Sequence, residues 1–217
     1  MSRLRLTLAA AALALAAEVL APIGSAVAAG RITTQTSAAV SKDNRLDFDY
    51  AFQVKKLNAD VVDPLIRTKA TAKRCEGCQS TALSYQVVLL QRPVDPLNVR
   101  PEVITDSINE ECATCDTVVG AYQYIVGRNG PIHITDEGKA QLTTIKREVA
   151  ALEKSGRRGP DMVAAADALG ARVRDVLALH VVRTDGVAAE GKVEELKVKR
   201  TDGAAPESST SEATLAP

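Results

Sequence analysis

The chain has 217 residues, of which 46% are hydrophobic, 25% are charged and only 3% are aromatic, and its 27 basic side chains balance its 27 acidic ones. This composition is typical of a globular protein and excludes the collagen-like and polytopic membrane classes. No basic block with interleaved aromatic residues occurs, so the sequence predicts no nucleic-acid surface. Its four cysteines suffice for two disulfides or one tetrahedral metal site.

Residues 1–29 have the features of a secretory signal peptide. Arg3 and Arg5 precede an apolar stretch, 6–17, that is too short to span a bilayer. Small side chains allow cleavage after Ala28 or Ala29, and no cysteine follows that could carry a lipid anchor. We therefore expect a secreted, extracytoplasmic protein whose thiols meet an oxidising environment.

A β-hairpin is predicted at the start of the mature chain. Residues 32–40 are rich in Thr, Val and Ile, residues 41–44 favour a turn, and residues 46–54 alternate with the period of a half-buried strand. Asp47 and Asp49 fall on the polar face of the second strand, where we expect solvated carboxylates and not an acid–base pair. Asp63-Pro64 is expected to end this extended region.

Two later apolar segments, 75–90 and 112–126, look like copies of one another. Each starts with C-x-x-C, has apolar residues at helical offsets, and carries a Tyr-Gln pair after the second cysteine, Tyr85-Gln86 and Tyr122-Gln123. We interpret the two segments as an internal duplication of a cysteine-led helix. The two tyrosines are expected to be buried with satisfied hydroxyls.

The C-terminal part predicts a helical hairpin. Residues 132–134 alternate as a short strand that could join the N-terminal hairpin, and Thr135 then caps a first helix. Its apolar stripe consists of Leu142, Ile145, Val149 and Leu152. Pro160 begins a second helix that runs to His180, and neither His133 nor His180 lies in a metal-ligand spacing. Residues 184–217 have too little apolar content to order themselves, so we expect a disordered tail.

These elements together predict one α+β domain over residues 30–183, between the signal peptide at 1–29 and the tail at 184–217. In this arrangement the N-terminal β-hairpin packs on the duplicated cysteine-led helices, and the helical hairpin follows.

Cys75, Cys78, Cys112 and Cys115 carry the chemistry of the sequence, and we favour disulfides because of the oxidising compartment. Pairing within each motif and pairing across the two motifs both remain open. A four-cysteine zinc site is one alternative, although the 33 residues between Cys78 and Cys112 exceed the spacing of zinc ribbons. Thiol–disulfide exchange is a second alternative, because a C-x-x-C at a helix N-terminus has a lowered thiol pKa. Unpaired, inert thiols in the apolar core are the third.

The same residues carry a resemblance to a known family. The matching strings are Asp60-Val61-Val62-Asp63, Cys75-x-x-Cys78, Gln86-Val87-Val88-Leu89, Asn109-x-x-Cys112-x-x-Cys115, Ala121-Tyr122-Gln123 and Gly130-Pro131-Ile132-His133. Over about residues 32–177 the chain resembles an uncharacterised secreted actinobacterial domain, which is similar to a module appended to putative membrane-embedded peptide zinc metalloproteases. The sequence lacks a protease zinc motif, so the resemblance implies the module without peptidase activity.

The sequence contains no nucleophile elbow, phosphate loop or dinucleotide fingerprint. We therefore expect a secreted, disulfide-stabilised, non-enzymatic structural or protein-binding module of the bacterial cell envelope. Its expected partner is a cell-envelope or membrane protein, and no resident cofactor is expected. An extracytoplasmic thiol-redox protein and a zinc-binding domain held by Cys75, Cys78, Cys112 and Cys115 are the alternatives.

Overall fold

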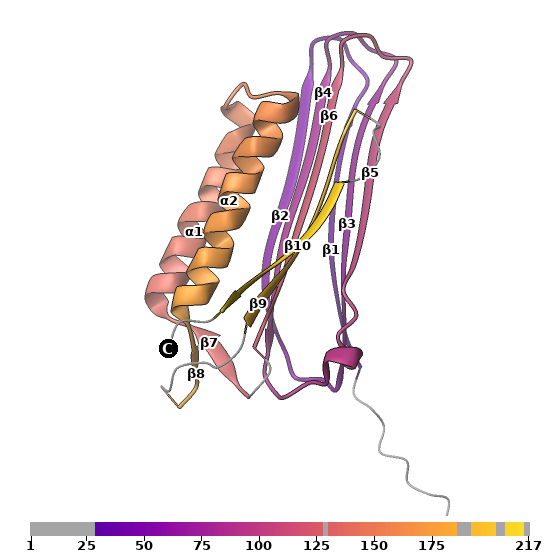
Figure 1. Ribbon diagram of the computed structural model, residues 1–217. Coiled ribbons are helices and arrows are strands. Elements are labelled where there is room, and N and C mark those ends of the chain that lie inside the picture. Colours follow the sequence, from indigo (N-terminus) through magenta and orange to yellow (C-terminus); the bar gives the residue numbers. More distant parts are fainter. Residues whose placement is uncertain (1–28, 128–129, 186–191, 203–206, 215–217) are drawn as a thin grey trace, which may run out of the picture.

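The computed structural model describes residues 29–127, 130–185, 192–202 and 207–214 and has three layers (Figure 1). The signal segment predicted at the N-terminus lies, up to residue 28, outside these residues. The strands are β1 (Ala29–Val40), β2 (Leu46–Leu57), β3 (Val61–Lys73), β4 (Gln79–Leu90), β5 (Glu102–Glu110), β6 (Asp116–Val126), β7 (Ile132–Ile134), β8 (Val181–Arg183), β9 (Lys192–Thr201) and β10 (Glu207–Thr214). The helices are α1 (Asp136–Ala151) and α2 (Gly159–His180), and two single 3-10 turns are η1 (Pro96–Asn98) and η2 (Leu152–Lys154).

From β1 to β6 the chain alternates between two parallel sheets. The outer sheet has the order β1-β3-β5, and the central sheet has the order β10-β9-β6-β4-β2. Each strand from β1 to β4 pairs in parallel with the strand two places later in the sequence. Consecutive strands therefore form the coils of a flattened β-solenoid: β1 with β2, β3 with β4, and β5 with β6.

The central sheet is covered on both faces, by the outer sheet on one side and by α1 and α2 on the other (Figure 1). Every residue of β4 is buried as a result. The space between the two sheets is filled by small apolar side chains and by hydroxyl pairs. The small side chains are Ala38, Ala70, Ala82 and Val119. The Ser84 hydroxyl lies 2.7 Å from the hydroxyl of Thr36 and accepts a hydrogen bond from Thr68 at 2.8 Å.

The predicted cysteine-led helices are wrong, because 75–90 and 112–126 contain the strands β4 and β6. A strand that is buried on both faces loses the alternation of apolar and polar residues and becomes a continuous apolar run. Such a run also places apolar residues at helical offsets, and this coincidence produced the error. The domain is mostly β-structure and is not an α+β hairpin packed on helices.

The predicted N-terminal hairpin is also wrong, although its two strands exist. β1 and β2 lie in different sheets, and β1 pairs with β3 while β2 pairs with β4. Asp63-Pro64 lies inside β3 and does not end it. The pairing of β3 with β5 begins only at Leu65, so proline occupies a position where the missing N–H interrupts no bond to β5.

The C-terminal helical hairpin is present, and Thr135 caps α1 by accepting a hydrogen bond from the Gly138 backbone N–H at 3.1 Å. The short strand β7 pairs with β8 and not with the N-terminal strands. The expectation of a disordered tail is wrong for 192–201 and 207–214, since β9 pairs with the edge of β6 and β10 pairs with β9. Backbone pairing with the open edge of β6 orders this part of the tail, although its apolar content is low.

Equivalent side chains stack along the central sheet from one coil to the next. The rings of Phe52 and Tyr85 lie 5.6 Å apart, and those of Tyr85 and Tyr122 lie 4.6 Å apart with an angle of 7° between their planes. Tyr85 donates its hydroxyl to the Ala166 carbonyl at 3.0 Å, and Tyr122 donates to Asp167 at 2.7 Å. Both tyrosines are buried with satisfied hydroxyls as expected, but they lie on neighbouring strands and not on helices.

A chain of glutamines crosses the same coils on the opposite face of the central sheet. Gln123 donates from Nε2 to Gln86 Oε1 at 2.8 Å, and Gln86 donates to Thr34 Oγ1 at 2.9 Å. Thr34 donates in turn to Gln53 Oε1 at 2.9 Å. The repeated Tyr-Gln pair of the sequence thus forms two ladders, one aromatic and one of amides.

No helix among the described residues combines the length and the hydropathy that crossing a bilayer requires.

Candidate functional site: a four-cysteine cluster

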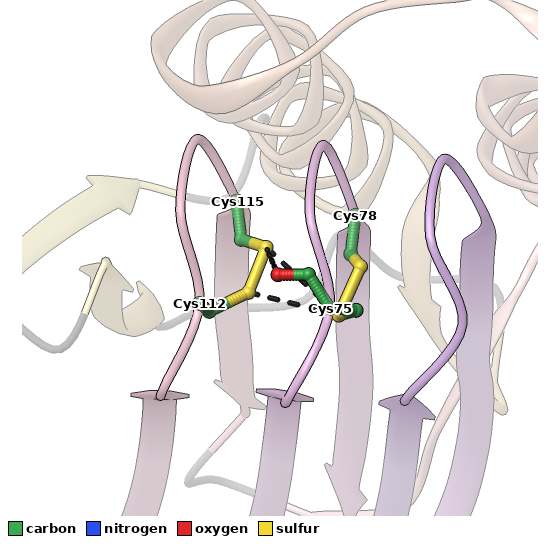
Figure 2. Close-up of side chains that lie close together, drawn as sticks. All are labelled: Cys75, Cys78, Cys112 and Cys115. Atoms are coloured by element: carbon green, nitrogen blue, oxygen red, sulfur yellow. Dashed lines mark hydrogen bonds between the residues drawn. A yellow bond between two sulfur atoms is a disulfide. The ribbon is translucent and has the colours of Figure 1, made fainter.

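The four cysteines lie on stacked turns at one end of the solenoid (Figure 2). The register of β2, β4 and β6 aligns the turn at 41–45 with those at 74–78 and 111–115. Asn44, Gly77 and Thr114 occupy the same place in successive turns, and their φ angles are 54°, 64° and 56°. The turns therefore repeat one backbone conformation, in the left-handed region that favours glycine and asparagine.

Backbone hydrogen bonds join the three turns. Asn44 N donates to the Glu76 carbonyl at 2.8 Å, and Gly77 N donates to the Ala113 carbonyl at 3.1 Å. A Cβ on Gly77 would lie 2.6 Å from Asn44 Oδ1, so a larger residue there would displace the Asn44 side chain. Asp43 accepts from the Glu76 backbone N–H at 2.9 Å. The sequence did not indicate that the sulfur-free turn at 41–45 belongs to this stack, because only its period relates it to the others.

All four sulfur atoms lie within 4.8 Å of one another. The sulfurs pair within each motif, Cys75 with Cys78 and Cys112 with Cys115, so the crossed pairing left open by the sequence is not the one found. Between the motifs, Cys75 Sγ lies 3.6 Å from Cys112 Sγ and 3.9 Å from Cys115 Sγ. Cys75 and Cys78 are buried, whereas the other pair is partly exposed.

Charged groups surround the cluster and connect it to the helical layer. Arg158, just before α2, donates to the backbone carbonyls of Gly77 at 3.2 Å and Cys78 at 3.3 Å and forms an ion pair with Asp116 at 2.6 Å. Lys73 pairs with Glu110 in the next coil, and its hydrogen bond lowers the pKa of the Glu110 carboxyl. Arg158 was not predicted from the sequence, which gave no sign that the loop before α2 reaches these turns.

The other predicted polar residues lie away from the four sulfurs. Asp49 accepts from the Ser37 backbone N–H at 2.7 Å, and Asp47 accepts from the backbone N–H of Ala39, so these carboxylates cap the free edge of β1 and are not simply solvated. His180 lies at the end of α2, with Nδ1 3.3 Å from Thr135 Oγ1. His133 lies on β7.

Two chemical states are compatible with this arrangement of sulfurs. Oxidised, the cysteines form two adjacent disulfides that stiffen the turns of the second and third coils. Reduced, four thiolates from two turns could surround one soft metal ion.

No family model, curated protein or solved structure matches the chain. The resemblance to the secreted actinobacterial module therefore stays a prediction.

Proposed function

We propose that this chain is a secreted, disulfide-stabilised β-solenoid that serves as a non-enzymatic structural or protein-binding module of the bacterial cell envelope. The observation that carries the proposal is the pairing of all four sulfurs on adjacent turns. Such pairs persist in an oxidising compartment and are rare where glutathione keeps thiols reduced. The predicted export signal at 1–29 points to the same compartment.

The polar groups of the interior support a structural role. Ser84, Gln86 and Gln123 are fully buried between the sheets, and each bonds to a group from another coil. Their hydrogen-bonding capacity holds successive coils in register. They are therefore components of the scaffold.

The state of the cysteines is tested by the intact mass of the purified protein after alkylation, with and without prior reduction. We expect no alkylation before reduction and four modified thiols after it. Trypsin leaves all four cysteines in one peptide, since Arg92 and Arg100 both precede proline. A protease that cleaves after tyrosine and leucine cuts between the two motifs, for example after Tyr85. If each disulfide lies within one motif, the two resulting peptides are not linked to each other. Free thiols in the untreated protein, or a linked pair of peptides, would contradict the proposal.

Export is tested by fractionating cells that express the full chain. We expect the extracytoplasmic fraction to contain a form that begins at Ala29 or Gly30, as read from its N-terminal sequence. A chain that keeps Met1 and stays in the cytosol would refute the assigned compartment.

A zinc-binding domain is the second candidate, and the distances between the motifs favour it. Zn–S bonds of about 2.3 Å place the sulfurs of a tetrahedral site about 3.8 Å apart. Cys75 lies 3.6 Å from Cys112 and 3.9 Å from Cys115, close to that separation. Forming the site would require a thiol reductant to open both disulfides, with two electrons taken up by each.

Cobalt is a spectroscopic substitute for zinc in this test. The protein is reduced without oxygen, and Co²⁺ is added to it and to the Cys112→Ser variant. Intense sulfur-to-cobalt absorption that saturates at one ion per chain and is lost in the variant would support the zinc site. Absence of this absorption from the reduced protein would eliminate it and leave the disulfide-stabilised module.

A further inference from the structure

The strand β2 forms one side of the central sheet, and no strand among the described residues pairs with its outer edge. The Arg45 carbonyl accepts from Gln79 N just before β2, and the Leu57 carbonyl accepts from Gln91 N at its end. Both acceptors are odd-numbered residues, and backbone groups alternate in direction along a strand. The even-numbered residues of β2 therefore direct their N–H and C=O groups to the open edge.

β1 is the edge strand of the outer sheet next to β2, and side chains block its free backbone edge, whereas nothing described pairs with the edge of β2. β1 lies at the same end of the solenoid, and the carboxylates of Asp49 and Asp47 bind its outward N–H groups at Ser37 and Ala39. Proteins commonly block a free edge with inward-pointing charges of this kind, which prevents pairing with another chain. The two aspartates that block β1 come from β2 itself.

Apolar side chains follow the open edge of β2. Phe48, Tyr50 and Phe52 are only partly buried against the main core, on the face that bears the helices. Leu46 and Val54 are 42% and 40% exposed. These two are among the four exposed large hydrophobic residues of the described part of the chain, the others being Leu97 and Leu179. Exposed apolar residues are thus concentrated on the strand whose backbone is unpaired.

When the sequence of β2 is reversed it is complementary to itself at one charged pair and two apolar pairs. Its first half carries Asp47 and Asp49, and its second half carries Lys55 and Lys56. A two-fold axis at Ala51, perpendicular to the sheet, places Asp47 opposite Lys55 of a second copy. The same axis places Phe48 opposite Val54 and Tyr50 opposite Phe52 on the helix-bearing face. Opposite charges and aromatic side chains facing one another are the pairs that stabilise antiparallel strands.

We propose that two copies of this chain associate through antiparallel pairing of β2 with β2, which joins their central sheets into one continuous sheet. The partner surface is the same in both copies, so the interface closes on itself and forms no filament. The even-numbered residues of both strands supply about a dozen backbone hydrogen bonds in this register. Lys55 and Val54 are the side chains whose replacement tests it.

The first test is the molar mass of the purified protein in solution, measured by light scattering and sedimentation from about 1 μM to about 500 μM. We expect a dimer, and we expect Val54→Lys and Lys55→Glu each to raise its dissociation constant at least about tenfold. Val54→Lys places a charge opposite Phe48 of the second copy. Lys55→Glu places a negative charge opposite Asp47. Lys154→Glu is the matched control, since this exposed lysine follows α1 and its replacement should leave the dimer intact. A monomer at every concentration, or a dimer that both β2 variants leave unchanged, would overturn the proposal.

The second test concerns the register. At the two-fold axis the Cβ atoms of Ala51 in the two copies lie about 5 Å apart, within the range that a disulfide spans. With glutathione disulfide as oxidant, Ala51→Cys should form a covalent dimer. Lys55→Cys should not, because its thiols lie on opposite sides of the axis, roughly 26 Å apart. Equal cross-linking of the two variants would refute this pairing.

Discussion

Replacing Gln86 by leucine tests whether the amide ladder holds the coils together. Gln86 is fully buried, donates to Thr34 Oγ1 at 2.9 Å and to the Leu65 carbonyl at 3.2 Å, and accepts from Gln123. Leucine has a similar volume but leaves these groups short of a partner inside the protein. Each such loss costs about 1–3 kcal/mol, so we expect a loss of stability of about 3–5 kcal/mol. For a domain of this size the midpoint of thermal unfolding should fall by roughly 6–20 °C.

The matched control is Gln53→Leu, at the β2 end of the same ladder. Gln53 is only partly buried and accepts one hydrogen bond, from Thr34. Water can replace that bond, so we expect a loss of no more than about 1 kcal/mol. Both variants are measured by urea unfolding followed by circular dichroism. Equal destabilisation of the two variants, or no effect of Gln86→Leu, would show that the ladder does not couple the coils.

Three further predictions concern the tyrosines, the contact between helix and sheet, and the turns. Burial is the main cause that raises the pKa of Tyr85, Tyr122 and Tyr124, so these phenols ionise near pH 10 only in the unfolded chain. The contribution of these three tyrosines to stability should be constant below about pH 9 and fall above pH 10 by up to about 4 kcal/mol per pH unit, as urea midpoints at pH 9 and 11 would measure. Tyrosinate absorbance at pH 11 from the folded Tyr50→Phe variant, which keeps only these three tyrosines, would contradict this. Gly170→Ala should cost about 1–3 kcal/mol, because a Cβ there lies 2.8 Å from the Tyr122 ring, and an unchanged thermal midpoint would disprove the close packing of α2 on the sheet. Thr114→Gly should raise stability by about 1 kcal/mol in the same assay, because threonine is strained at its φ of 56° and the equivalent position of the preceding turn holds Gly77. A loss of stability would show that Thr114 is not strained.

Part of the fold could be predicted from the sequence, because some elements are only partly buried. The alternation in 46–54 located β2, and the spacing of Leu142, Ile145 and Val149 located α1. The strands β4 and β6 could not be recognised by period, because helices cover one of their faces and the outer sheet covers the other. The pairing partners of β1 to β4 could not be predicted either, since each of these strands bonds to the strand two places later in the sequence.

At the candidate site, too, the features that depend on neighbouring residues could be predicted and those that depend on tertiary contacts could not. The repeat of C-x-x-C with a following Tyr-Gln correctly indicated two equivalent segments, and the structure places their four sulfurs in one cluster. The sequence also singled out Asp47 and Asp49, but their role at the edge of β1 depends on a contact between sheets. Arg158 was missed because it reaches the turns through tertiary packing alone.

The order in which the strands lie beside one another has a consequence for how the protein folds. Ala29 pairs with Val61 and Leu46 pairs with Gln79, so neither strand of the first coil can form its ladder until the second coil has been synthesised. Each such pairing must first close a long, flexible loop, and this makes folding slow compared with that of a helical bundle. The first coil of the nascent chain is therefore without its strand partners until the second coil emerges.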